Sequence, residues 1–263
     1  MELVRVTKEN LGNEHICCAI SNNKDVQVVS KKTWLSERFD EGLVFLKGNV
    51  RGKCFIEYIP AEFAWAPIEA DGYMYVNCLW VSGQFKGHGY SNLLLEECIR
   101  DSREKGKKGL VMLSSAKKKG FLADKKYLQY KGFQVADKSE PYFELLYLPF
   151  DEESEKPRLI NNRVEDRDGL VLYYTNQCPF TAKYVPLLEK IANDRGVAMK
   201  TVHIETLEQA KKSPCPFTTF SLYFNGEFIT HEIQSEKKFE KIIDDLENSE
   251  CLGSTSAACF LLL

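Results

Sequence analysis

The stretch from Tyr73 to Lys105 constrains the fold more than any other part of the chain. Tyr73 to Trp80 has the pattern of a strand, and Tyr90 to about Lys105 has the apolar spacing of an amphipathic helix. Gly87 and Gly89 lie in the turn between them and can adopt unusual main-chain dihedrals at no steric cost. Such a turn directs N–H groups and the positive end of a helix at one place, which suits a pyrophosphate. The sequence therefore predicts an α/β fold with an anion site at this turn.

Several side chains around the turn complete this predicted cofactor site. Lys86 and His88 lie beside the glycines, where we expect them to contact outer phosphates. The spacing is neither the six-position fingerprint of dinucleotide-binding proteins nor a P-loop ending in Gly-Lys-Ser/Thr. The predicted cofactor-binding residues are Val81, Gln84, Phe85, Lys86, Gly87, His88, Gly89, Tyr90 and Ser91.

Length, charge and cysteine usage limit the other possibilities. A chain of 263 residues suits one large or two ordinary domains. A net charge of -3 gives no general attraction to nucleic acid or to an acidic membrane, and no run reaches the ~18 apolar residues of a membrane helix. The nine cysteines show no framework spacing, and the N-terminus is charged, so we expect a cytoplasmic protein. The C-terminal tail is apolar but has Phe260 where a prenylation box needs cysteine.

The secondary-structure pattern divides the chain into two α/β domains, residues 1–150 and 170–248, with a tail at 249–263. The charged, proline-containing segment 151–169 is typical of a linker. In the second domain we expect the order strand, helix, strand, helix, strand, strand, helix, with a hairpin turn at Asn225-Gly226. The predicted strands are 1–7, 42–47, 53–59, 73–81, 110–113, 133–135, 142–148, 170–174, 197–204, 219–224 and 227–230; helices are expected at 7–18, 31–39, 90–105, 124–130, after 181 to 194, at 207–212 and at 237–246.

Two motifs in this order resemble those of the GNAT N-acetyltransferases. Gln84-x-x-Gly87-x-Gly89 is similar to the acetyl-CoA signature of that family, and Lys131-Gly132-Phe133 resembles its second signature. The second domain, with Cys178-Pro179 at its first helix, resembles thioredoxin and glutaredoxin. A GNAT domain, a linker and a thioredoxin-like domain together resemble the YoaP type of N-acetyltransferase over nearly all of residues 1–248.

The resemblance implies a GNAT mixed sheet flanked by helices, followed by a smaller thioredoxin-like α/β domain. It also implies an enzyme that moves an acetyl group from acetyl-CoA to a primary amine. The acceptor is expected to be a small molecule or a peptide, and the protein a monomer or homodimer. A main-chain N–H near residues 79–81 is expected to polarise the thioester carbonyl, as in relatives that splay their strands there.

Acetyl transfer also needs groups that move protons. Many relatives place a carboxylate on the strand before the glycine turn, but the strand here has none, so Glu57 and Glu62 are the candidate bases. Glu57 is alternatively an outward-facing carboxylate of its strand. The tyrosine position of the family falls on Leu128; Tyr127 is one residue away and Tyr130 two, and Tyr127 is the candidate acid. Since a free thiol has a pKa near ~8.5, the thiolate can also leave unprotonated.

Cys178 is a second candidate reactive group. It lies where a helix begins, so we expect the helix dipole to lower the pKa of its thiol. Thr181 occupies the fourth position of the Cys-x-x-Cys pattern, and Cys215, followed by the candidate cis-proline Pro216, is the expected thiol partner. Two interpretations stay open: a redox centre, or a retired redox fold used for docking or for shaping the acceptor site. The alternative function is a thiol-disulfide oxidoreductase or glutathione-type binder with a non-catalytic CoA-binding module.

Three further groups of residues have two interpretations each. His15, Cys17 and Cys18 are close in sequence, but adjacent helical residues point about 100° apart, so we predict core cysteines and no metal site. The lysines at 117–119 and 125–126 form either a solvated helix end or a site for the 3′-phosphate of CoA. Aromatic residues either line an acceptor pocket or belong to the core; they are Phe63, Trp65, Tyr73 and Trp80.

Overall fold

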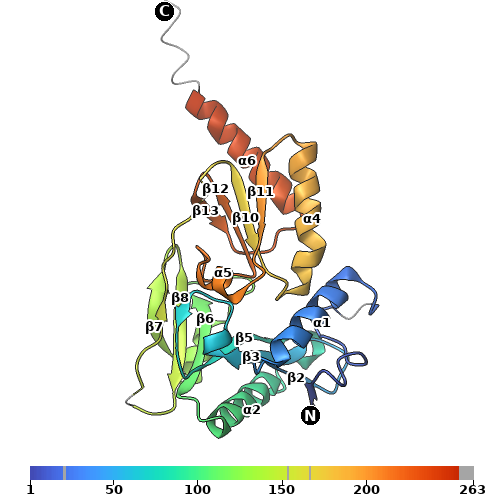
Figure 1. The fold of residues 1–263 in the computed structure, drawn as a ribbon, viewed down its shortest axis with the longest axis vertical. Coiled ribbons are helices and arrows are strands. Elements are labelled where there is room, and N and C mark those ends of the chain that lie inside the picture. Colours follow the sequence, from blue (N-terminus) through green and yellow to red (C-terminus); the bar gives the residue numbers. More distant parts are fainter. Residues whose placement is uncertain (20–21, 153, 166, 255–263) are drawn as a thin grey trace, which may run out of the picture.

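The computed structural model describes residues 1–19, 22–152, 154–165 and 167–254 and shows two sheets with flanking helices (Figure 1). The larger sheet has seven strands in the order β1-β2-β3-β5-β6-β8-β7. Its strands are β1 Leu3–Val6, β2 Val44–Gly48, β3 Cys54–Pro60, β5 Met74–Val81, β6 Gly109–Ser115, β7 Gln134–Ser139 and β8 Phe143–Pro149. The helices of this part are α1 Val26–Phe39, α2 Tyr90–Glu104 and α3 Lys125–Tyr130, with short 3-10 turns at Ala61–Phe63 and Gly83–Phe85.

Strands β5 and β6 diverge in the middle of this sheet. They are parallel and pair only at Met74 with Leu110 and Tyr75 with Val111. Beyond Val76, β5 continues to Val81 while still paired with β3, and β6 continues to Ser115 while paired with β8. The carboxyl end of β5 therefore borders a gap in the sheet, at the point where the glycine turn begins.

The two faces of the seven-stranded sheet are covered differently. Alternating side chains of one strand point to opposite faces, as Phe45 and its neighbours Val44 and Leu46 do. One face packs against α2 and α3, which contribute Leu94 and Leu128. The other face packs against α1 and against residues of the smaller sheet, including Val171 and Tyr223. Both faces are therefore buried, and the smaller sheet lies on the α1 side (Figure 1).

The smaller sheet has four strands in the order β11-β10-β12-β13. Strand β10 is parallel to β11 and antiparallel to β12, which forms a hairpin with β13. The element order matches the prediction for the second half of the chain. The bounds are β10 Leu170–Tyr174, α4 Pro179–Asp194, β11 Met199–His203, α5 Leu207–Lys211, β12 Phe220–Phe224, β13 Glu227–Thr230 and α6 Glu236–Ser254.

The two halves are held together by helix packing and by hydrogen bonds. Helix α1 lies against α4, as Figure 1 shows. The Thr218 hydroxyl, ahead of β12, donates a hydrogen bond to the carbonyl of Trp65. His231, which is fully buried, contacts the Tyr142 hydroxyl through Nδ1 at 2.7 Å and the Gly120 carbonyl through Nε2 at 2.9 Å.

Four predictions about the elements were wrong. Residues 7–18 form turns and bends, not a helix, and Cys17 has a φ of +58°, outside the right-handed helical region. Helix α1 begins at Val26, earlier than predicted, and α6 continues to Ser254. The predicted linker contains strand β9, Arg158–Leu159, paired with β4, Ile68–Glu69. Of the predicted tail at 249–263, residues 249–254 belong to α6 and residues 255–263 lie outside the described residues.

Candidate functional site: two cavities at the splayed strands

The turn after β5 has the geometry of an anion-binding loop, and we call residues 83–89 the glycine loop. Gly83, Gly87 and Gly89 have φ of +64°, +82° and +75°, a left-handed conformation that costs other residues about 1–2 kcal/mol. Gly89 is also the N-cap of α2, so main-chain N–H groups of the first helical turn have no intrahelical acceptor. A Cβ added at any of these glycines would meet nothing within 4 Å. The space beside the glycine loop is therefore open to a ligand.

This space is a cavity of about 370 Å³, which we call the loop cavity. It is bordered by the ends of β5, α2 and α3. Gln84 and His88 do not line it; the His88 ring stacks on Tyr90 with 5.6 Å between centroids. The predicted cofactor-binding residues that do line it are Val81, Phe85, Lys86, Gly87, Gly89, Tyr90 and Ser91.

Tyr127 and Lys118 also line the loop cavity. The Tyr127 hydroxyl donates to Asn92 Oδ1 at 3.3 Å, and burial raises the pKa of Tyr127. Lys118 pairs with Asp124 at 3.4 Å and is otherwise exposed. A tyrosine that keeps its proton and a cation thus border the same space.

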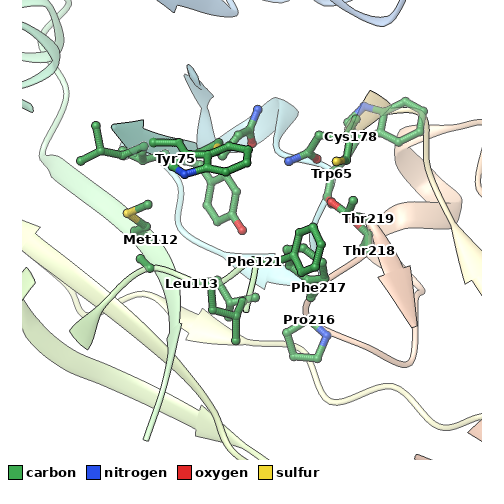
Figure 2. A pocket seen from close by; sticks show the side chains of 18 of the residues that line it. Trp65, Tyr75, Met112, Leu113, Phe121, Cys178, Pro216, Phe217, Thr218 and Thr219 are labelled. Atoms are coloured by element: carbon green, nitrogen blue, oxygen red, sulfur yellow. The ribbon is translucent and has the colours of Figure 1, made fainter. Parts of the chain in front are cut away.

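A second cavity, of about 360 Å³, lies on the other side of the strand gap, and we call it the interdomain cavity. Figure 2 shows Met112 and Leu113 on one side of it, Cys178, Thr218 and Thr219 opposite, and the rings of Phe121 and Phe217 between them. Both halves of the chain therefore supply its walls. Four residues line both cavities: Leu79, Trp80, Met112 and Ala123.

Trp65 and Trp80 line the interdomain cavity, as the acceptor-pocket interpretation expected. Phe63 is 42% exposed, and Tyr73 is a buried core residue whose hydroxyl donates to the Glu155 carbonyl. Neither lines the cavity; the core interpretation is correct for Tyr73, and neither interpretation holds for Phe63.

Glu57 lies behind the wall of the interdomain cavity, not on the outside of its strand. It is 1% exposed, and Lys31 Nζ on α1 contacts its Oε2 at 2.5 Å. Asn77 Nδ2 donates to the other oxygen at 3.0 Å. Asn77 lines the cavity and Glu57 does not, so Glu57 is joined to the cavity wall by its hydrogen bond to Asn77.

Glu62 lines neither cavity. Its carboxylate accepts the Gly72 N–H at 2.9 Å and pairs with Lys107 at 3.1 Å. Burial by itself would raise the pKa of Glu62, but the main-chain and Lys107 hydrogen bonds outweigh it and lower the pKa. This placement gives Glu62 a role in joining chain segments.

Cys178 lines the interdomain cavity, but the expected lowering of the pKa of its thiol was wrong. Burial raises the pKa of its thiol to about 11, because removing the thiolate from water outweighs the main-chain hydrogen bond at the helix start. The expected partner Cys215 does not line this cavity, and burial raises its pKa to about 12. Cys18 and Cys78 share the cavity with Cys178 instead.

Sequence reasoning missed several lining residues of the interdomain cavity. Asn77 is the extra residue of a β-bulge opposite Glu57 and Tyr58, and Phe121, Gln177 and Phe217 lie on loops. Loops give no periodic pattern from which a side-chain direction can be read. The one usable signal was aromatic residues next to glycine or proline, such as Phe217 after Pro216.

Two searches of the described residues bear on other kinds of site. Among residues 1–254, without the gaps, no three His, Cys, Asp or Glu side chains come together as metal ligands would. His15 contacts the Val50 carbonyl at 2.8 Å. The same part of the chain has no helix long and apolar enough to span a membrane.

Comparison with known proteins identifies a relative over almost the whole chain. The "Uncharacterized N-acetyltransferase YoaP" of Bacillus subtilis (strain 168) is 40% identical over 247 residues, which cover 92% of this chain and 98% of the relative. The family described as YoaP-like matches residues 199–241.

Solved structures of GNAT proteins are similar to parts of the chain. The GNAT family N-acetyltransferase YhbS of Escherichia coli, solved in complex with CoA, covers 61% of this chain and 89% of its own length at 11% identity, with a TM-score of 0.39. The ribosomal-protein-S18-alanine N-acetyltransferase of Escherichia coli covers 59% of this chain and 96% of its own length at 14% identity, with a TM-score of 0.38.

Proposed function

The chain belongs to the YoaP-like N-acetyltransferases, and from that membership we propose that it transfers an acetyl group from acetyl-CoA to a primary amine. It is thus an acyltransferase, and the question that remains is how its residues carry out the reaction. The open glycine loop beside the diverging strands is the observation that supports this assignment most strongly. It offers main-chain donors and a helix N-terminus at one end of a cavity that reaches the strand gap.

The loop cavity fits acetyl-CoA. Its pyrophosphate would lie against the N–H groups near Gly87 and Gly89, in the space that an added Cβ would fill. Lys86 and Lys118 border the cavity and supply positive charge. Acetyl-CoA supplies the reactive thioester, and the strand gap is the place where its carbonyl can reach unpaired main-chain groups of β5. Alternate residues between Cys78 and Val81 direct their N–H groups away from β3 and into this gap.

The interdomain cavity is the proposed acceptor site. It meets the loop cavity at Leu79, Trp80, Met112 and Ala123, so an amine there can approach the thioester from the opposite face of the sheet. Tyr127 lines the loop cavity and keeps its proton, since burial raises its pKa, and we propose it as the acid for the leaving thiolate. Glu57 acts as a positioning residue that holds Asn77.

We infer that residues 170–248 form a thioredoxin-like domain that follows the domain 1–150 and the segment 151–169. The strand order β11-β10-β12-β13 and the flanking α4 and α6 support this inference. The raised pKa of Cys178 argues against a thiol-disulfide oxidoreductase, so we propose that this domain shapes the acceptor site.

Titration of acetyl-CoA into the protein by calorimetry tests the assignment. In Gly89→Val, the side chain would fill the space for the pyrophosphate, and the left-handed φ would be strained. We expect the affinity to fall about tenfold or more, which is the effect of losing about 1.4 kcal/mol of charge-assisted hydrogen bonding.

Gly106→Val is the matched control. Gly106 also has a positive φ, +66°, and open space around a Cβ, but it follows the C-terminal end of α2. It should carry the same backbone strain and leave acetyl-CoA binding unchanged. Equal affinities of the wild type and Gly89→Val would refute the proposed cofactor site.

A further inference from the structure

The lining of the interdomain cavity indicates the chemical class of the acceptor. We infer that this cavity binds a small primary amine whose body is aromatic or otherwise apolar and carries no second charge. The inference rests on the proposed acetyl transfer and adds the substrate class to it.

The cavity contains no group that could compensate a second charge. None of the described residues that line it is Asp, Glu, Lys, Arg or His. A polyamine or a lysine-rich peptide that loses one proton still carries other ammonium groups, and these would lose hydration here without gaining an ionic partner. An acidic acceptor would lose its hydration in the same way. The charge balance therefore favours a monoamine.

The walls and the size of the cavity suit a ring. Aromatic side chains come from both halves of the chain and include Trp65, Trp80, Phe121 and Phe217. Offset or edge-to-face contacts with such walls add to the gain from burying apolar area. A volume of about 360 Å³ is near the lower end of the ~300–1,000 Å³ typical of small-molecule sites. The space suits a small molecule, and of a longer chain it could hold no more than the terminal residue, so we infer a small-molecule acceptor.

The polar end of the acceptor has one evident position. The amine must lie near Leu79 and Trp80, where the two cavities meet. Asn77 lines the same wall, and because its amide nitrogen donates to Glu57, its oxygen is the group left to accept a hydrogen bond from the amine. An uncharged, apolar cavity also lowers the pKa of a bound ammonium group, which favours the reactive neutral amine without a lining carboxylate.

The second half of the chain sets the far wall. Phe217 packs edge-on against the buried His231 with 5.3 Å between ring centroids. The next residue, Thr218, is hydrogen bonded to the Trp65 carbonyl of the first half. Phe217 is therefore held in a fixed position, and we assign it the role of a specificity-determining residue.

The inference is tested by the acetylation of 2-phenylethylamine and of spermidine by the full-length chain, with the rate measured as CoA release. We expect a lower KM for 2-phenylethylamine in the wild type. Phe217→Asp puts a carboxylate into the wall, so the KM for 2-phenylethylamine should rise about tenfold or more, while spermidine improves relative to it. Phe217→Leu should keep most of the activity.

Two measurements separate the possible failures. Acetyl-CoA affinity, measured by calorimetry, should be equal in the wild type and Phe217→Asp, which also shows that the variant folds. Phe63→Asp, at an exposed aromatic residue outside the cavity, should leave both KM values unchanged. If acetyl-CoA binds but spermidine or a phenylalanine-initiated peptide is preferred, the inferred class is wrong and the proposed transfer stands. If acetyl-CoA does not bind, both fail.

Discussion

At the scale of the residue, surroundings outweigh sequence position, as Cys178 shows. Its place at the start of α4 predicts an activated thiol, because a helix N-terminus stabilises a thiolate. The structure puts the side chain in an apolar cavity, where the uncharged thiol is favoured. Its chemistry follows from neighbours such as Trp65 and Phe217, which lie far away in the sequence.

Cys178 should therefore react slowly with thiol reagents at neutral pH. A pKa of about 11 leaves almost no thiolate at pH 7, and the thiolate is the nucleophile. We expect iodoacetamide labelling of the Cys178 peptide, followed by mass spectrometry, to keep rising up to at least pH 10. Cys178→Ser identifies the peptide signal. A labelling midpoint below pH 8 would restore the redox interpretation.

At the scale of the element, the buried ion pair between α1 and β3 fixes the wall behind the cavity. Lys31 and Glu57 are 2% and 1% exposed, and Glu57 also holds Asn77. Removing one of two paired buried charges leaves the other buried without a counter-charge, whereas removing both leaves no unpaired charge. We therefore expect this pair to position Asn77, and the stability lost on removing one partner to come mainly from the unpaired charge that remains.

Glu57→Gln should lower the free energy of unfolding by about 3–5 kcal/mol, because it leaves the Lys31 ammonium buried without a counter-charge. Lys31→Met in the same chain should recover much of the loss. Urea denaturation of the two single variants and the double variant measures this coupling. Asp194→Asn, which removes one partner of the exposed Lys190–Asp194 pair, is the control and should change stability by less than about 1 kcal/mol. Additive single effects at Lys31 and Glu57 would contradict the argument.

Elements could be predicted where the signal is local. The turn at Gly87 and Gly89 and the hairpin at Asn225-Gly226 depend on dihedrals that neighbouring residues specify. Strand β9 could not be predicted, because Leu159 becomes a strand residue only by pairing with Ile68. The helix expected at 7–18 does not form, and Cys17 within it has a left-handed φ of +58°, which the sequence pattern does not reveal.

At the scale of the whole molecule, one buried histidine joins the two halves. His231 follows β13 and contacts Tyr142 and Gly120 of the larger sheet and its loop. Glu232 accepts the Gly120 N–H at 3.0 Å, and Lys119 is the nearby cation. The loop from Gly120 leads directly to Phe121, Leu122 and Ala123 in the interdomain cavity wall.

Acid should weaken this junction. Burial lowers the pKa of His231 in the folded chain. As the pH falls below the unfolded pKa of about 6.5, the unfolded chain therefore binds a proton at this histidine more readily than the folded chain does. The stabilisation is complete above that pH and is lost as the pH falls toward the folded pKa, by up to ~1.4 kcal/mol per pH unit.

Comparison with His231→Gln isolates this effect, because glutamine keeps hydrogen-bonding groups and does not titrate. Urea denaturation at pH 7.5 and 5.5 should show a larger loss for the wild type than for the variant. His15, whose pKa is also lowered by burial, contributes equally to both proteins and cancels. Parallel pH profiles would show that His231 does not couple protonation to stability.

The candidate site could be predicted only where its residues lie close together in the sequence. The loop cavity is built from residues 79–91 and 112–128, so its central motif was visible in one stretch of sequence. The interdomain cavity joins β5 and β6 to residues 177–180 and 216–219, which lie in the second half of the chain. Its aromatic character could be suspected from Trp65 and Trp80, but its far wall exists only when the two halves pack.

The divergence of β5 and β6 determines how the two substrates of the proposed reaction could reach each other. Because one cavity lies on the α2 side of the sheet and the other on the α1 side, the proposed cofactor and acceptor would occupy separate spaces and could be bound at the same time. The two cavities meet at the gap between β5 and β6, so the proposed transfer would need no side chain to carry the acetyl group. In the proposed reaction the acetyl group would pass directly from the cofactor to the amine in a single step.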